Sequence, residues 1–265
     1  SKFTLISLHF IFGYGMVKLG FNYVILVLDR VFKGMRVSEK NFVNKPDWGV
    51  LEEKWLQNYQ VNSEKCLSGF VLNSTHKIIE NDKSLESHYQ RVLEIGSGLM
   101  AHFGYVRHHF DEYIASDHDA KVIELLKKRS FDERVSLLKL DGANLPFDND
   151  SVDRLIATHV LEHVSNPTQV LEEWVRVVRP GGVISLILPC DPGFSWRLGR
   201  SLGPRRRATQ MGLPYDYYMA LEHKNSIHNL INILEFHFPI RNEKWWPLKF
   251  KSVDLNLIYG VNCYI

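Results

Sequence analysis

Short apolar runs alternate with amphipathic segments of ten or more residues from about position 91 to position 188. This alternation is typical of βαβ units, in which a parallel sheet is covered by helices. The pattern predicts helices at Leu99–His109 and Asp119–Arg129. The predicted strands are Val92–Ile95, Tyr113–Ser116, Val135–Leu140, Asp153–Thr158 and Val183–Leu188.

The best delimited helix follows Asn166, which is a favourable N-cap before Pro167 and Gln169. The run Arg179-Pro180-Gly181-Gly182 is expected to end it. Beyond the fifth strand, residues 190–217 are rich in Gly, Pro and Arg, and we interpret them as an irregular lid insertion. The remaining predicted elements are a helix at Met219–Phe236 and strands at Pro239–Trp246 and Leu255–Tyr264.

These elements predict an α/β fold, a Rossmann-like open, mostly parallel seven-stranded sheet with helices on both faces. We assign this domain to residues 91–265 and a mostly helical cap region to residues 46–90. Residues 1–45 form an apolar N-terminal extension, in which Phe3–Leu28 contains a single charged residue, Lys18. Such a segment is long enough to contact or cross a membrane, and packing against the rest of the protein is the alternative.

Composition narrows the possible functions. The 32 Lys and Arg residues nearly balance the 30 Asp and Glu residues, so the chain has no general basic surface for nucleic acid. Its three cysteines are far apart, which argues against a disulfide framework or a zinc knuckle and favours a reducing compartment. We therefore expect a cytoplasmic protein, with membrane association through residues 3–28 as the open alternative.

Acidic residues and glycines follow successive predicted strands. Gly96 and Gly98 lie where the first strand turns into the first predicted helix, and glycine there lets a ligand approach the backbone closely. Asp117 ends the second strand, where a carboxylate can accept hydrogen bonds from ribose hydroxyls. Asp141 and Gly142 end the third strand at the same edge of the sheet. The pattern indicates a nucleoside site.

Together these motifs resemble the class I S-adenosylmethionine-dependent methyltransferases, and most closely their small-molecule branch with the ubiquinone and menaquinone biosynthesis enzymes. The resemblance extends over about residues 91–188. It rests on the following segments: Glu94-Ile95-Gly96-Ser97-Gly98, Asp117, Asp141-Gly142-Ala143, Leu145 to Asp153, His159-Val160-Leu161-Glu162-His163 and Arg179-Pro180-Gly181-Gly182.

The resemblance implies S-adenosylmethionine as cofactor and a distinct role for each motif. Glu94, Gly96, Ser97 and Gly98 would surround its methionine part. Asp117 would hold the ribose, with His118 beside it. The residues expected near the adenine are Asp141, Gly142 and Ala143, and those expected near the methyl group are Thr158 and His159. The family often has a third glycine where this chain has Met100, a bulky side chain that could narrow the turn.

Two other interpretations of the same residues stay open. The segment Gly96–Ala101 also fits the dinucleotide fingerprint of an NAD-dependent oxidoreductase, although the acidic Glu94 favours the methyl donor. A non-catalytic binding subunit could retain the fold. The segment His159–His163 matches an inverted zinc-protease motif, but its helical spacing is doubtful, so we expect no metal.

Methyl transfer from a sulfonium mainly requires alignment of the acceptor and exclusion of water. An acceptor hydroxyl would need a base, for which His159, His163 and His223 are the candidates. The fourth strand ends Ala157-Thr158-His159-Val160 and lacks the motif with which related enzymes grip a planar nitrogen, so DNA is not expected as a substrate.

The acceptor is predicted to be a small molecule that is anionic, sugar-linked or lipid-linked. The expected negative charge rests on the lid residues Arg205, Arg206, Arg207, Tyr215 and Tyr217, and the expected lipid link rests on the apolar N-terminal segment. Guanidinium groups recognise phosphate or carboxylate. RNA is a weaker alternative, since the same residue types also stack bases. The acceptor atom and the oligomeric state stay open.

Overall fold

The computed structural model describes residues 75–265, which lie in one compact unit of the chain. The predicted N-terminal extension, its apolar segment 3–28 and residues 46–74 of the predicted cap lie outside the described residues. The described part of the cap contains α4 (Lys77–Glu80), and β1 (His88–Ile95) begins three residues before the predicted boundary at residue 91.

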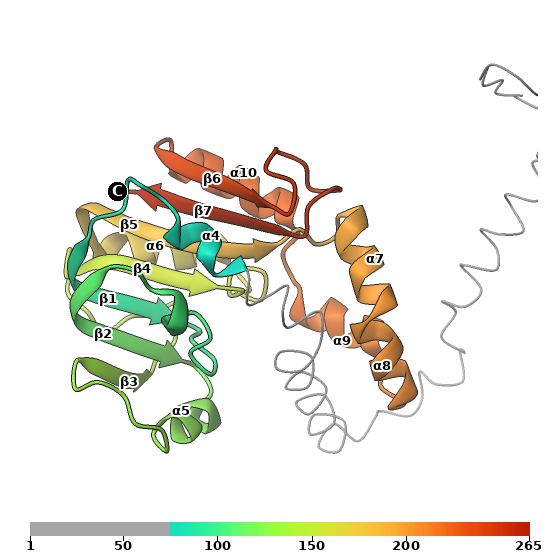
Figure 1. The fold of residues 1–265 in the computed structure, drawn as a ribbon, viewed down its shortest axis with the longest axis horizontal. Coiled ribbons are helices and arrows are strands. Elements are labelled where there is room, and N and C mark those ends of the chain that lie inside the picture. Colours follow the sequence, from blue (N-terminus) through green and yellow to red (C-terminus); the bar gives the residue numbers. More distant parts are fainter. Residues whose placement is uncertain (1–74) are drawn as a thin grey trace, which may run out of the picture. The chain divides into compact units, whose positions relative to one another are not determined.

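A seven-stranded sheet with the order β3-β2-β1-β4-β5-β7-β6 forms the centre of the unit (Figure 1). Its first five strands are parallel, and β7 runs antiparallel to both β5 and β6. The strands not yet given are β2 (His109–Asp117), β3 (Val135–Lys139), β4 (Val152–Thr158), β5 (Val178–Pro189), β6 (Arg241–Trp246) and β7 (Ile258–Tyr264). The predicted α/β sheet is confirmed. Parallel strands bring their carboxyl ends to one edge, where ligands bind in open α/β folds.

Each face of the sheet has its own core. On one face, α6 (Pro167–Val177) and α10 (Ile227–His237) bury Leu171, Trp174 and Leu230 against the strands. On the other face, α4, α5 (Ala120–Leu126) and the segment after β1 bury residues that include Ile79 and Leu126. Burial on both faces explains why the central strands are continuous apolar runs.

The capping signals predicted from the sequence operate as expected in α6. The side chain of Asn166 accepts a hydrogen bond from the backbone N–H of Gln169 at 3.3 Å, and Pro167 occupies the first turn. The helix ends at Val177, two residues before the predicted stop at Arg179. There Arg179 donates to Asp153 at 2.5 Å, which ties the start of β5 to β4.

The predicted helix at Leu99–His109 is wrong. The segment contains turns and only a short 3-10 helix, η2 (Phe103–Tyr105), before β2 begins at His109. Met100 has φ +60°, a left-handed conformation that a right-handed helix cannot contain. The chain therefore returns to the sheet earlier than the apolar spacing indicates.

The prediction that residues 190–217 are irregular is also wrong, whereas their assignment as a lid stays a prediction. Three helices form there and just beyond: α7 (Phe194–Leu202), α8 (Pro204–Gln210) and α9 (Tyr215–Glu222). They follow the carboxyl end of β5 (Figure 1). The predicted helix at Met219–Phe236 is divided between α9 and α10, because the side chain of Ser226 caps a new helix by accepting from the N–H of Asn229.

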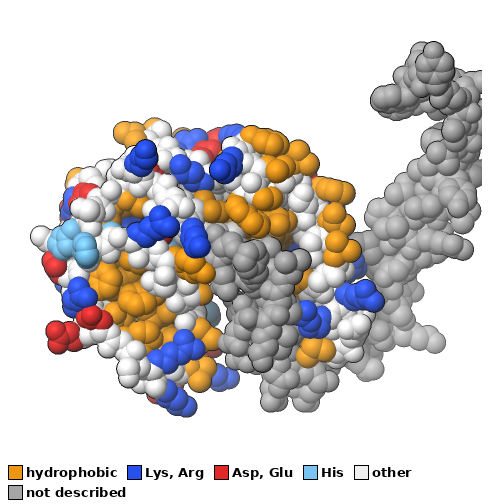
Figure 2. Space-filling view, viewed as in Figure 1, with side chains coloured by type: hydrophobic (Ala, Val, Ile, Leu, Met, Phe, Trp, Pro, Cys, Tyr) orange, Lys and Arg blue, Asp and Glu red, His pale blue; other side chains and the backbone are white. Residues whose placement is uncertain are grey.

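Helix α7 is amphipathic, and it exposes one row of apolar side chains. Phe194, Leu198 and Leu202 repeat at helical spacing. Figure 2 shows hydrophobic side chains along the edge of the described surface where Figure 1 places α7. None of the helices between residues 75 and 265 has both the length and the apolar character needed to span a bilayer.

Candidate active site

The turn after β1 is a tight loop in which three residues have positive φ. Gly96 (φ +64°), Gly98 (φ +51°) and Met100 (φ +60°) adopt left-handed conformations. A Cβ atom on Gly96 would lie 2.6 Å from Cγ2 of Val160, which follows β4. Glycine is therefore required at position 96 by its backbone conformation and by the close approach of the β4 segment.

Met100 does not act as the sequence suggested. It stands where the family often has a third glycine, and its backbone is left-handed, a conformation that glycine adopts without strain. Its side chain is only 6% exposed and belongs to the core cluster on the face of the sheet that carries α4 and α5. The bulky side chain thus contributes to the core.

Glu94 is buried at the end of β1 with one carboxylate oxygen unsatisfied. Its Oε2 accepts a hydrogen bond from the Tyr113 hydroxyl at 2.7 Å, whereas Oε1 is buried and has no hydrogen-bond partner. Burial raises the pKa of the Glu94 carboxyl. A buried acceptor without a donor is costly, so this oxygen fits a ligand that supplies an N–H or a positive charge.

Asp117 holds the glycine turn at the end of β2. Its Oδ2 accepts from the backbone N–H of Gly98 at 3.1 Å and its Oδ1 from that of Asp119 at 2.9 Å. The neighbouring His118 is largely exposed, and its Nδ1 lies 3.3 Å from Asp117 Oδ1. The carboxylate therefore links the first two strand ends that the sequence assigns to a nucleoside.

The third strand end lies beside the second. Trp174 of α6 donates from Nε1 to the carbonyl oxygen of Gly142 at 2.8 Å, which fixes the loop after β3. Asp141 Oδ1 accepts from the N–H of Ala143 at 3.0 Å. A shallow cavity of about 390 Å³ is lined by residues of both strand ends: His118, Lys139, Leu140 and Asp141. Position and lining fit a base and its sugar.

The carboxyl end of β4 carries a strained histidine. His159 follows Thr158 with φ +59°, a conformation uncommon for histidine and frequent at functional sites. Its Nε2 is buried without a hydrogen-bond partner, and its Nδ1 lies 3.4 Å from Glu162 Oε1.

The three candidate histidines converge, although one of them is far away in the sequence. The rings of His163 and His223 have their centroids 5.0 Å apart and meet edge to face. Glu162, which the sequence analysis did not single out as a site residue, lies between His159 and His163, with Oε1 at 3.4 Å and 3.8 Å from their nearest nitrogens. Asp191, at the end of β5, accepts from His223 at 2.8 Å and was also missed. Its position at a strand end was the available signal.

The expected acceptor residues lie on α8 and α9 and are in part engaged with the protein itself. Arg205 forms an ion pair with Asp216 at 2.5 Å. Tyr215 is buried under the Arg200 guanidinium, which lies 5.3 Å from its ring centroid. Arg206 and Tyr217 are exposed, and Arg207 is half-buried.

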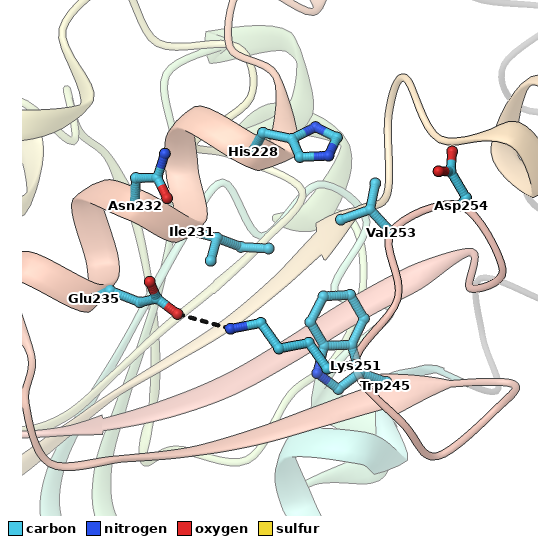
Figure 3. A pocket seen from close by; sticks show the side chains of 8 residues that line it. All are labelled: His228, Ile231, Asn232, Glu235, Trp245, Lys251, Val253 and Asp254. Atoms are coloured by element: carbon cyan, nitrogen blue, oxygen red, sulfur yellow. Dashed lines mark hydrogen bonds and ion pairs between the residues drawn. The ribbon is translucent and has the colours of Figure 1, made fainter.

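A second cavity of about 320 Å³ lies between α10 and the loop after β6 (Figure 3). Its lining includes Trp245 and the ion pair of Glu235 with Lys251, whose atoms are 2.9 Å apart. None of its lining residues belongs to the strand ends described above. The first cavity, though only slightly larger, is therefore the one that bears on the site.

Comparison with known proteins supports the resemblance. Residues 93–186 match a family model described as a methyltransferase domain. Demethylmenaquinone methyltransferase of Clavibacter sepedonicus is 30% identical over 96 residues, 36% of this chain and 39% of that protein. A chloroplastic 2-methyl-6-phytyl-1,4-hydroquinone methyltransferase of Oryza sativa subsp. japonica is 28% identical over 112 residues, 42% of this chain and 34% of that protein. The chain thus spans well under half the length of these two relatives.

A solved structure shares the fold over most of the chain. A putative S-adenosylmethionine-dependent methyltransferase of Methanococcus maripaludis superposes with a TM-score of 0.54 at 15% identity, over 86% of this chain and 97% of that one. The family match over residues 93–186, together with the sheet order and the glycine turn, supports the resemblance to the class I S-adenosylmethionine-dependent methyltransferases. This family match favours the methyl donor over NAD for the glycine turn.

Proposed function

We propose that the chain transfers a methyl group from S-adenosylmethionine to a small-molecule acceptor. The observation that carries the proposal is the unsatisfied, buried Oε1 of Glu94 beside a left-handed glycine turn, in a domain of this family. The methionine part of the cofactor has a cationic amino group, which would satisfy that oxygen.

The other strand ends would hold the rest of the cofactor. Asp117 keeps lone pairs for ribose hydroxyls while it accepts from Gly98, and Asp141 with Ala143 would face the adenine at the cavity after β3. Bound in this way, the cofactor would supply an activated methyl group. The chain's own task is to place the acceptor beside Thr158 and His159 and to keep water away.

The test of cofactor use is calorimetric titration of S-adenosylhomocysteine into the purified full chain. We expect saturable 1:1 binding, weakened at least 10-fold by Glu94→Gln, which keeps the shape and removes the charge. Glu172→Gln, an exposed carboxylate on α6, is the matched control and should bind like the wild type. Binding of NAD without binding of S-adenosylhomocysteine would refute the proposal.

Turnover requires a second measurement. Release of S-adenosylhomocysteine in the presence of a panel of acceptors would distinguish an enzyme from a binding subunit that retains the fold. Cofactor binding without turnover for hydroxylated, anionic, sugar-linked and prenylated acceptors would favour the binding subunit.

We propose further that the acceptor is anionic, whether sugar-linked or lipid-linked, and contacts Arg206, which is exposed on α8. Guanidinium groups bind phosphate or carboxylate in bidentate fashion. Arg206→Gln should raise the KM for an anionic acceptor several-fold and leave cofactor affinity unchanged. Lys249→Gln in the exposed loop after β6 should change neither quantity. A change in cofactor affinity alone would contradict this placement.

A further inference from the structure

Three potential metal-binding side chains meet at the carboxyl edge of the sheet. Glu162 and His163 follow β4, and His223 follows α9, 60 positions later in the chain. One carboxylate oxygen and one ring nitrogen from each histidine all lie within 4.8 Å of one another. This spacing suits donors arranged around a single ion.

The backbone holds the two segments together. The side chain of Asn225 donates from Nδ2 to the carbonyl oxygens of Leu161 and Val164, at 2.9 Å and 2.7 Å. Its backbone N–H donates to the carbonyl oxygen of Glu162 at 3.1 Å. The donor groups are therefore positioned by the protein itself, without help from a ligand.

Both histidines are oriented as metal ligands usually are. His163 Nδ1 lies 2.9 Å from the carbonyl oxygen of Glu222, and His223 Nδ1 lies 2.8 Å from Asp191 Oδ2. With the proton on Nδ1, each ring donates to that oxygen and leaves the lone pair of Nε2 available. A carboxylate or carbonyl behind the imidazole is the usual outer partner of a metal-bound histidine. Asp191 is held in turn by Arg200 at 2.9 Å.

Glu162 provides an independent indication of a ligand. The residue is only 2% exposed, and its Oε2 is buried without a hydrogen-bond partner. Among residues 75–265, no Lys or Arg forms an ion pair with Glu162, and its charged neighbours are His159 and His163. A buried carboxylate with an unsatisfied oxygen is costly unless a cation or a donor joins it.

We propose that Glu162, His163 and His223 bind one divalent transition-metal ion. Two imidazole nitrogens and one carboxylate oxygen suit Zn²⁺, Co²⁺ or Mn²⁺, whereas Mg²⁺ and Ca²⁺ prefer oxygen ligands. Three protein ligands leave coordination positions open for water or an acceptor. This assignment replaces the expectation of no metal: the ion uses the last two residues of the H-x-x-E-H segment and a third ligand from after α9.

The site also suggests how an acceptor would be activated, and this role rests on the proposed function. Two of the ligands, Glu162 and His163, follow closely after Thr158 and His159, where we place the acceptor. A hydroxyl bound to the ion would lose its proton to solvent more readily. Its oxygen would then form a bond to the methyl carbon while the carbon–sulfur bond breaks and the electron pair stays on sulfur. His163 and His223 would act as ligands and not as bases.

The experiment uses the full chain, freed of metal with EDTA, and titrates Co²⁺ by visible absorption and Zn²⁺ by calorimetry. We expect one equivalent of each ion to bind, with at least 10-fold weaker binding in Glu162→Gln and His223→Gln. Asp191→Asn should weaken binding 10- to 100-fold through the orientation of His223. His228→Ala removes an exposed histidine on α10 and should bind like the wild type.

Several results would overturn the metal site. These are the absence of stoichiometric binding to the wild type, equal binding by the wild type and the folded His223→Gln variant, or selective binding of Mg²⁺. His223 is partly exposed, so this variant is expected to fold even if Glu162→Gln does not. Titration of S-adenosylhomocysteine into the metal-free chain separates the two proposals. Binding of S-adenosylhomocysteine without binding of metal refutes only the metal site. Binding of metal without binding of S-adenosylhomocysteine refutes only the proposed function.

Discussion

Replacing Gly96 by alanine tests how the glycine turn is held against the end of β4. Position 96 has φ +64°, and a Cβ there would lie 2.6 Å from Val160 Cγ2. Carbon atoms in contact normally lie about 3.5–4.0 Å apart, so the valine methyl or the turn must move by about 1 Å. Gly98 has a similar backbone, φ +51°, but a Cβ there would meet nothing within 4 Å. The two glycines thus separate backbone strain from steric overlap.

The expected magnitudes follow from this difference. A left-handed backbone costs an L-residue roughly 1–2 kcal/mol, which both alanine variants incur. Gly96→Ala adds an overpacking cost of about 1–3 kcal/mol, giving about 2–5 kcal/mol in all. Val160→Ala removes the overlapping methyl group. In the double variant it should therefore recover most of the overpacking cost.

Urea unfolding of the wild type, the three single variants and the double variant would measure these free energies. The slope of the transition with denaturant should stay constant across the set. Equal destabilisation by Gly96→Ala and Gly98→Ala, or additive effects of Gly96→Ala and Val160→Ala within about 0.5 kcal/mol, would refute the reasoning. The affinity for S-adenosylhomocysteine, measured on the same variants, should be lower in Gly96→Ala than in the wild type, because the glycine turn is displaced.

Three further predictions concern the buried polar groups around the site. The Arg154 guanidinium lies 2.7 Å from the buried Glu80 carboxylate, so Arg154→Leu should lower the free energy of unfolding by about 3–5 kcal/mol. Restoration of stability by adding Glu80→Leu to this variant would confirm that the unpaired carboxylate is the cause. Burial, and to a lesser extent the nearby histidines, lower the pKa of His76 from its ordinary 6.5 to about 3. Between these pH values the unfolded state binds more protons than the folded state, so the free energy of unfolding should fall by about 2 kcal/mol from pH 7.5 to pH 5. If His76→Gln leaves the pH dependence of the urea midpoint unchanged, this prediction is contradicted. Trp174→Phe removes the hydrogen-bond donor to the Gly142 carbonyl, so it should lower the stability in thermal unfolding by about 1–3 kcal/mol and weaken cofactor binding. Unchanged cofactor affinity would mean that the loop after β3 does not contact the adenine.

Local patterns in the sequence predicted the parts of the fold that depend on neighbouring residues. Apolar runs identified all seven strands, and the signal is strongest for the central ones, because burial on both faces of the sheet makes them continuously apolar. Asn166 and Pro167 marked the start of α6, because helix capping involves residues only a few positions apart in the sequence. The helix predicted after Gly98 failed because apolar spacing does not reveal that Met100 adopts a left-handed backbone.

The candidate metal site depended on tertiary structure. The sequence placed Glu162 and His163 together, but only the return of the chain after α9 brings His223 to them, and only the end of β5 supplies Asp191 behind His223. Side chains 60 positions apart leave no periodic signal, because their meeting depends on the order of strands and the path of each crossover. The sequence by itself predicted the strands, the positions of the glycines in the turn and the resemblance to methyltransferases. The tertiary structure decided which charged groups are buried, which are paired, and which are left to bind a ligand.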